Sequence, residues 1–240
     1  MAIILEICVE TMASIAAARA GGADRIELCS ALALGGLTPS AGLIAAAVAQ
    51  PLPCHVMIRP RGGDFAYDAD EVAQMERDIA YAAGAGMAGV VFGAARDGAL
   101  DRPVLDRLMA CVRTAGRPLS TTLHRAIDTL DDPVAAIEVA VGLGLDRVLS
   151  SGGATTALTG IETLRAMHER AAGRLKVMAG SGINAGNVAA LLAAGVDEIH
   201  ASCSSPRPSE NAALHRLDFA ATVPITDAGR VRALREAIDS

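Results

Sequence analysis

Short apolar runs alternate with longer segments of helical periodicity along the whole chain. Four of the apolar runs follow one pattern, in which a helix is followed by a glycine, a polar or small residue and a strand. They read GADRIEL from residue 22, GMAGVVF from 86, GLDRVLS from 144 and GVDEIHA from 195. Four other strand-like runs lie between them: ILEICV from 4, HVMIRP from 55, STTLHRA from 120 and KVMAGSG from 176. Strands that alternate with helices in this way are typical of parallel β-α units.

The pattern predicts eight strands and eight helices in a single domain over residues 1–240. The strands are expected near 3–9, 24–29, 54–60, 89–93, 119–125, 147–151, 175–180 and 197–202. The helices are expected near 11–20, 39–49, 69–84, 102–114, 132–142, 155–171, 184–194 and 226–238. This count is typical of an α/β fold of the (β/α)8 TIM-barrel type. The alternative is a doubly wound open sheet, but Cys8-Val9-Glu10 is not the glycine-rich fingerprint expected after its first strand.

Composition and charge narrow the classes of partner. The 240 residues carry a net charge of −6 and show no basic stripe, which argues against nucleic-acid binding. The uncharged run 79–95 is shorter than the ~20 residues of a membrane span, so no membrane association is expected. The five cysteines are scattered without a CxxC pair, which favours a reduced, cytoplasmic protein. The oligomeric state stays open, and a homodimer is one possibility.

Alternation along the strands predicts which side chains fill the barrel. Apolar residues take the helix-facing positions, so the polar residues between them are expected inside. The expected interior residues are Glu6, Cys8, Glu10, Arg25, Glu27, Cys29, His55, Met57, Arg59, Thr122, His124, His200 and Ser202. Buried charges are costly unless they are paired or solvated near the mouth. Glu6 and Glu27 could therefore act as a catalytic carboxylate pair, or form structural ion pairs with Arg59 and Arg25.

The segment HVMIRPRGGD, residues 55–64, contains the densest group of charged residues next to a predicted strand. Pro60 ends the strand, and Arg59 and Arg61 point to the same side of an extended chain. Arginine forks suit carboxylate and phosphate oxygens, and Asp64 lies beside them. His124 ends another strand and precedes Asp128, so it is a candidate acid–base group, and Asp64 is the catalytic candidate beside the arginines.

Two glycine turns follow predicted strands, at Ser151-Gly152-Gly153 and at Gly180-Ser181-Gly182. Free backbone N–H groups and following helix N-termini could form an anion site there, while the alternative is a simple tight turn. The last strand contributes Ser202 to the same end. One anion pocket is therefore predicted at the C-terminal mouth of the barrel. Its residues are Arg59, Arg61, Asp64, His124 and the Gly180 turn, with Arg25, Asp128, Ser151, Gly152, Gly153, His200 and Ser202 as further binding candidates.

Several motifs together resemble one family. LEICVE, GADRIELCSALALGGLTPS, HVMIRPRGGDF, TLHRAID, RVLSSGGA and MAGSGIN resemble, in order, the signature blocks of the CutC family, from about residue 3 to 204. The resemblance implies a TIM barrel, a role in copper homeostasis and Cu(I) binding through cysteines, which correspond to Cys8 and Cys29. Leu123 and Ile127 stand where relatives usually have phenylalanine, and residues 206–224 do not match the tyrosine- and arginine-rich loop of relatives.

Two functional hypotheses follow. The first is a copper-binding homeostasis protein, in which Cys8 and Cys29 hold Cu(I) with Met57 or His55 nearby. The second is an enzyme acting at the C-terminal barrel mouth on a small anionic metabolite, for example a phosphorylated one, which would explain the arginines, His124 and the glycine turns. Free cysteines also serve as small core residues, and we expect that role for Cys54, Cys111 and Cys203.

Overall fold

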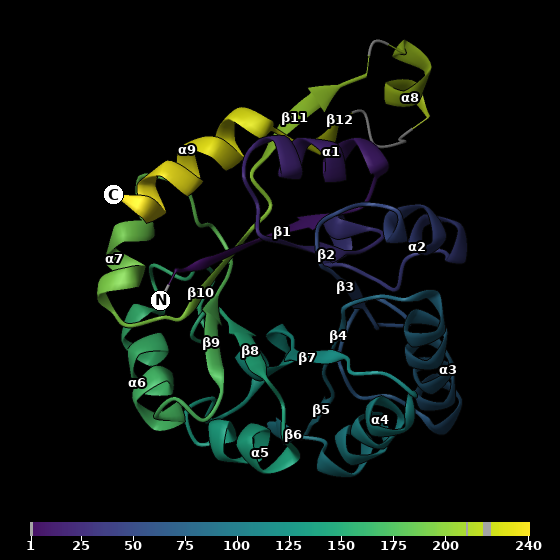
Figure 1. The fold of residues 1–240 in the computed structure, drawn as a ribbon, viewed down its shortest axis with the longest axis vertical. Helices are drawn as coiled ribbons and strands as arrows, with labels where there is room; N and C mark the ends of the chain where they lie inside the picture. The colour runs from purple at the N-terminus through teal and green to yellow at the C-terminus, as the bar shows by residue number, and fades with distance from the viewer. Residues whose placement is uncertain (1, 210, 218–221) are drawn as a thin grey trace.

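The computed structural model of the protein describes residues 2–209, 211–217 and 222–240. Eight parallel strands form a closed barrel in the order β1-β10-β9-β8-β7-β4-β3-β2. The strands are β1 (Ile4–Val9), β2 (Arg25–Leu28), β3 (Cys54–Met57), β4 (Gly89–Phe92), β7 (Ser120–Leu123), β8 (Arg147–Ser150), β9 (Lys176–Ala179) and β10 (Glu198–Ala201). Figure 1 shows this barrel surrounded by helices, so the predicted TIM barrel is confirmed and the open sheet is excluded.

The outer helices cover the apolar faces of the strands. They are α1 (Met12–Ala20), α2 (Ala41–Val48), α3 (Ala69–Ala85), α4 (Arg102–Thr114), α5 (Ala136–Leu143), α6 (Ile161–Ala171), α7 (Val188–Ala193) and α9 (Ala228–Asp239). Helix-facing strand residues such as Leu5, Ile7 and Ile26 are completely buried against them. In the described part of the chain, none of the helices has the length and apolar composition needed to cross a membrane.

The recurring Gly-x-Asp segments have a structural explanation. Asp24, Asp146 and Asp197 each accept a hydrogen bond from a backbone N–H of the neighbouring strand, at 2.8, 2.7 and 2.9 Å. The next residue is the first of its strand and enters the barrel interior. The fourth copy has Gly89 at that position, where a Cβ would lie 2.7 Å from the ring of His55. The repeat therefore aligns adjacent strands and determines which charges enter the N-terminal end of the barrel.

Three helices begin at least four residues later than predicted: α5 at Ala136, α6 at Ile161 and α7 at Val188. The delay is clearest before α6, where the chain first packs against the neighbouring turn. There the Ala157 N–H donates to the Ser181 carbonyl, and Thr156 and Thr159 exchange hydrogen bonds. These tertiary contacts override the helical periodicity of residues 155–160.

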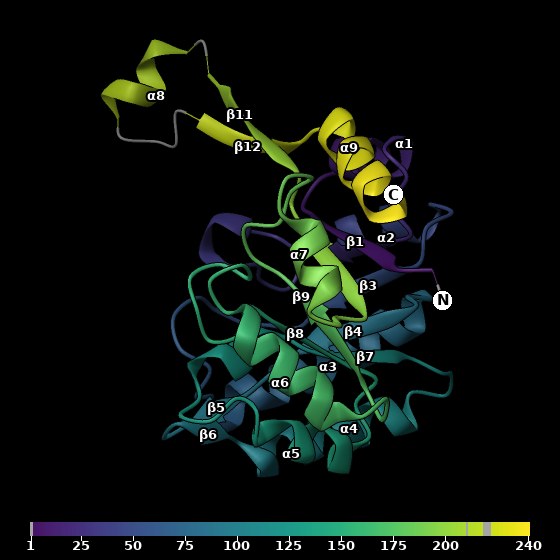
Figure 2. The ribbon, with the colours of Figure 1, turned by 90° about the vertical axis from the view of Figure 1, so that its left-hand side faces the viewer.

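Several short elements were not predicted. Two are 3-10 segments, Leu32–Leu34 and Arg125–Thr129, and two are the paired strands β5 (Ala95–Arg96) and β6 (Ala99–Leu100). The others form an arm between β10 and α9, made of β11 (Ser204–Pro208), α8 (Ala212–Arg216) and β12 (Thr222–Thr226). Figure 2 shows this arm projecting beyond the ring of helices, close to α9.

Candidate functional site

A cavity of about 740 Å³ lies at the C-terminal ends of the strands, where active sites of this fold are found. Many of the predicted site residues line it: Cys8, Glu27, Arg59, His124, Asp128, Gly153, Ser181, Gly182, His200 and Ser202. The other predicted residues do not line it: Glu6, Arg25, Cys29, Arg61, Asp64, Ser151, Gly152 and Gly180. The roles of the residues outside the cavity lining therefore follow from the contacts that they make elsewhere in the structure.

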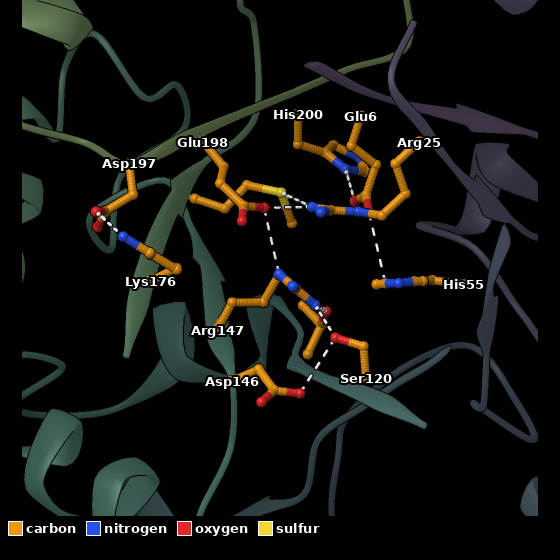
Figure 3. Close-up of polar contacts among 12 residues, drawn as sticks. Glu6, Arg25, His55, Ser120, Asp146, Arg147, Lys176, Asp197, Glu198 and His200 are labelled. Carbon is orange, nitrogen blue, oxygen red and sulfur yellow. Dashed lines mark hydrogen bonds and ion pairs between the residues drawn. The ribbon is translucent and has the colours of Figure 1, made fainter. Parts of the chain in front are cut away.

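Below the cavity, a charged network fills the N-terminal half of the barrel (Figure 3). Arg25 contacts the carboxylates of Glu6 and Glu198, and Arg147 lies 3.2 Å from Glu198. Arg25 was a predicted anion-binding residue, but its guanidinium is already paired inside the core. The predicted alternatives Glu6–Arg59 and Glu27–Arg25 are not among the ion pairs of the described residues. Arg147 and Glu198 were missed, although the repeat places both at the position that Arg25 occupies.

On the floor of the cavity, Cys8, Glu27 and His200 each offer one donor atom, and these atoms lie within 4.8 Å of one another. β1, β2 and β10 are neighbours, and their alternation brings the three side chains inside. His200 Nδ1 lies 2.8 Å from a Glu6 oxygen, which leaves Nε2 on the side of Glu27, at 3.8 Å. Glu6 thus orients the histidine from below.

The pKa values of the two buried carboxylates, Glu6 and Glu27, are shifted in opposite directions. Burial raises the pKa of Glu6, but Arg25 and His200 lower it further, so its net pKa lies well below the ordinary value. Burial raises the pKa of Glu27, and His200 opposes this only in part. Burial lowers the pKa of His200, yet the nearby Glu27, Cys8 and Glu6 hold it well above 6.5. His200 is therefore the cation of this cluster, and Glu6 is its anion.

Cys29 is completely buried and lies behind the cavity wall. Its thiol donates to a Glu27 oxygen at 3.4 Å, and it packs with Met57 and Val91. Burial and the neighbouring Glu27 raise the pKa of this thiol well above 9. Cys29 is therefore joined to the floor cluster through Glu27.

Arg59 follows β3 and is only 5% exposed, yet it borders the cavity. Its guanidinium donates to the carbonyl oxygens of Leu34, Gly36 and Gly63 at 2.8, 3.2 and 2.9 Å. It also lies over the ring of Phe65, 4.9 Å from the centroid. Arg59 thus holds two loops together at the mouth.

Arg61 and Asp64 lie outside the cavity, contrary to the prediction of a single pocket. Arg61 Nε donates to Glu71 at 2.5 Å, and its Nη2 lies 2.9 Å from Asp64. Glu71 belongs to the capping box of α3, with Asp68 as the N-cap. The strand ends at Met57, two residues earlier than Arg59, so the alternation that was extended to Arg61 does not apply there.

His124 follows β7 and is 3% exposed, with its ring 5.0 Å from that of Phe65. Its Nδ1 accepts the Ala126 N–H at 3.1 Å, so the neutral ring carries its proton on Nε2. Burial and the charge of Arg59 lower its pKa to about 3, while Asp128 acts in the opposite direction. His124 is a neutral hydrogen-bond donor at physiological pH. Phe65, between His124 and Arg59, was not predicted, although it directly follows the Gly62-Gly63-Asp64 run.

The turn at Ser151-Gly152-Gly153 does not offer free N–H groups, contrary to the prediction. Asp128 accepts from the N–H groups of Ser151 and Gly153, at 3.0 and 3.1 Å, and Ser150 Oγ accepts from Gly152 at 2.8 Å. Asp128 therefore fixes this turn as an internal anion, and the helix N-terminus that was expected next to it begins only at Ile161.

The turn at Gly180-Ser181-Gly182 differs from the turn at Ser151-Gly152-Gly153. Gly180 donates to the Ser150 carbonyl, and a Cβ there would lie 2.5 Å from Leu149, so this glycine serves packing. Ser181 and Gly182 border the cavity with positive φ angles of 86° and 71°. Within residues 2–209, 211–217 and 222–240, their backbone N–H groups have no hydrogen-bond acceptor.

Comparisons with other proteins agree with this architecture. A profile of the CutC family matches residues 3–205. A family protein CutC from Sinorhizobium medicae is 48% identical over 241 residues, which cover 99% of this chain and 97% of the relative. A family protein CutC from Caulobacter vibrioides is 50% identical over 208 residues, which cover 86% of this chain and 83% of the relative.

A crystal structure of CutC from Streptococcus agalactiae, a protein assigned to copper homeostasis, superposes with a TM-score of 0.77 at 30% identity. The match covers 83% of this chain and 98% of that one. The extent of the profile match and the identity to the curated relatives show that this chain belongs to the CutC family.

Proposed function

We propose that this protein serves in copper homeostasis by binding Cu(I) at the floor of the barrel cavity. The observation that supports this most directly is the convergence of Cys8, Glu27 and His200, whose donor atoms lie within 4.8 Å of one another. Thiolate and imidazole are ligands that suit Cu(I), and Cys8 reaches the cavity from which an ion would enter.

The surroundings of His200 also suit a metal ligand. Histidines that bind metals usually donate their other ring N–H to a carboxylate, which fixes the orientation of the ring. Here Glu6 occupies that position, 2.8 Å from Nδ1, and Nε2 stays on the cavity side, where a bound ion would replace the Nε2 proton of the His200 cation. Arg25 in turn holds Glu6.

Cys29 is the second thiol of the proposal. Its Sγ lies 3.4 Å from Glu27, next to the donor cluster, with Met57 packed against it. One ion bridging Cys8 and Cys29 needs the two sulfurs within about 5 Å of each other, if each metal–sulfur bond is ~2.3 Å as for zinc thiolates. All five cysteines are free thiols, as a protein of the reducing cytoplasm would keep them.

Anaerobic Cu(I) titration against a chromophoric Cu(I) chelator tests the proposal. We expect one tightly held ion per wild-type chain, and weaker binding or none in Cys8→Ala and in the Cys8→Ala, Cys29→Ala double variant. Cys111→Ala is the matched control, because this half-buried thiol on α4 lies away from the cavity. Equal stoichiometry and affinity in wild type and the double variant would rule the site out.

X-ray absorption of the copper-loaded protein distinguishes the donor sets. Two sulfur neighbours indicate that Cys8 and Cys29 bridge the ion, whereas one sulfur with a nitrogen neighbour indicates Cys8 with His200. Loss of the nitrogen contribution in His200→Gln would identify the histidine. A copper ion without sulfur neighbours contradicts the proposal.

A further inference from the structure

Arg59 is a buried cation whose charge is not balanced. The other two buried arginines, Arg25 and Arg147, both contact Glu198. Arg59 contacts carbonyl oxygens, the Phe65 ring and the neutral hydroxyl of Tyr67, and among the described residues no carboxylate lies within 4.0 Å of it. Its Nε is buried and has no acceptor in that part of the chain. Because an unpaired buried charge is costly, an anion in the adjacent cavity would stabilise it.

His124 supplies a second unused donor on the same wall. Its Nε2 is buried and has no acceptor among the described residues, while Nδ1 is occupied by the Ala126 N–H. Arg59 and His124 both contact the Phe65 ring, so the two donors flank one side chain. A neutral N–H beside a guanidinium is an arrangement that binds an oxygen anion.

The carboxylates near this wall do not fill that role. Asp128 accepts from the turn at Ser151 and Gly153 and lies 2.8 Å from Arg125, so it is fully bonded. Glu27 lies on the floor with His200 and Cys29. Among the described residues, the protein therefore places no carboxylate of its own against Arg59 and His124.

Ser181 and Gly182 border the same cavity from the end of β9. In the barrel, β7 lies between β3 and β9, with β4 and β8 as spacers. The Ser181 side chain donates to the Thr155 carbonyl at 2.8 Å, while the backbone N–H groups of the turn have no acceptor among the described residues. A ligand held by Arg59 and His124 would reach this turn with its other end.

We propose that the cavity binds a small organic oxyanion, separately from the metal-donor cluster. Its anionic group, a carboxylate or a phosphate, occupies the part of the cavity that Arg59 and His124 line, and the buried Nε–H and Nε2–H of these residues are the donors that still lack an acceptor. A second polar or acidic group contacts the backbone N–H groups of Ser181 and Gly182. This is the site that an enzyme acting on a small anionic metabolite would need. It does not depend on copper binding.

Calorimetric titration of metal-free, reduced protein with inorganic phosphate and, in parallel, with succinate tests this site. We expect saturable binding of one probe or both, and the preferred probe identifies the anionic group. Arg59→Gln should weaken binding about tenfold to a hundredfold, and Arg59→Lys should also weaken it because the Nε donor is lost. His124→Phe keeps an aromatic ring and should reduce affinity without changing the net charge.

The matched control is Arg61→Gln, which removes the same charge from the same loop but outside the cavity. Wild type that binds neither probe at tens of millimolar, or Arg61→Gln that weakens binding as much as Arg59→Gln, would overturn the proposal. If Arg59→Gln fails to fold, the anion affinities of Arg59→Lys and His124→Phe test the proposal, and unchanged affinity in both would overturn it. Anion binding that survives in Cys8→Ala separates this site from the proposed copper site.

Discussion

His124 shows how burial determines a protonation state. Nδ1 is fixed as an acceptor by the Ala126 N–H, and the ring lies so close to Gly93 that a Cβ there would be 2.6 Å from that nitrogen. Arg59 approaches from the loop after β3, and Asp128 lies on the segment that follows His124. The imidazole is therefore held neutral, with Nε2–H as a fixed donor.

The pKa of His124, about 3, makes the free energy of unfolding depend on pH. The unfolded chain binds a proton at His124 near pH 6.5, whereas the folded chain does so only near pH 3, so stability is lost as the pH falls through this window. We expect about 2 kcal/mol of the unfolding free energy to be lost between pH 7 and pH 5 through this residue.

Urea unfolding of wild type and of His124→Phe at both pH values measures this contribution, because His55, whose pKa burial also lowers to about 3, acts equally in both proteins. Nitrogen NMR should show the Nε2–H tautomer down to about pH 4. An imidazolium signal at pH 6, or identical acid sensitivity of the two proteins, would contradict the expectation.

At the scale of elements, the Gly-x-Asp segments act as connectors between strands. Asp146 accepts hydrogen bonds from the backbone N–H and hydroxyl of Thr121, at 2.7 and 3.2 Å, and from the hydroxyl of Ser120. Thr121 Oγ1 also accepts a hydrogen bond from the Asp146 N–H. The start of β8 is thus fixed against the start of β7.

Asp146→Ala should therefore destabilise the protein by about 1–3 kcal/mol, since the N–H of the buried Thr121 loses its acceptor. Asp106→Ala is the control, because that exposed carboxylate on α4 makes only an ion pair with Arg102, and a change of less than about 1 kcal/mol is expected. Chemical denaturation measures both. Equal losses would show that the strand connection contributes little.

The strands and helices were predictable because each copy of the repeat carries its own local signal: a glycine at a helix end, an aspartate in three of the four copies, then an apolar run. The closed sheet followed from counting them. Arg147 and Glu198 could have been assigned to the interior by the same repeat. The delayed start of α6 could not be predicted from the repeat, because it depends on the contact of Ala157 with a turn from another unit.

The candidate site was predictable only in part. Alternation correctly placed Arg59, His124, Cys8 and His200 around one cavity. Alternation held just past the strand ends at Arg59 and His124, but it failed at Arg61, whose partner Glu71 lies on a helix. Asp128 accepts the N–H groups of the Ser151 turn, and Gly180 packs closely against Leu149. Both contacts depend on distances between loops, and these distances cannot be read from one sequence.

At the scale of the whole molecule, the arm is an addition to a complete barrel. The family profile ends at residue 205, where β11 has just begun, and α9 then packs against α1 and α7 to complete the ring of helices. The described residues of the arm do not line the cavity. The base of the arm is the pairing of Ser204 with Thr226.

Replacement of residues 207–223 by an Asn-Gly turn should therefore leave the barrel intact. Residues Pro206 and Pro224 are paired across the hairpin and are the points to be joined. We expect a melting temperature within a few degrees of wild type, since β11 and β12 are mainly exposed or half-buried. Circular dichroism checks the fold, and copper or anion titration checks the cavity. Loss of either binding activity would show that the arm contributes to the site.

The hydrogen bond between Glu6 and His200 joins residues 194 positions apart. During synthesis, Cys8 and Glu27 leave the ribosome early, but their partner on β10 is made only when most of the chain exists. Contacts of such long sequence separation form late in folding, after the entropy of closing the intervening chain has been overcome. A nascent chain shorter than about 200 residues therefore has neither a closed barrel nor a complete donor cluster. Ligand capture at this floor would report that β10 has been made and that the barrel has closed.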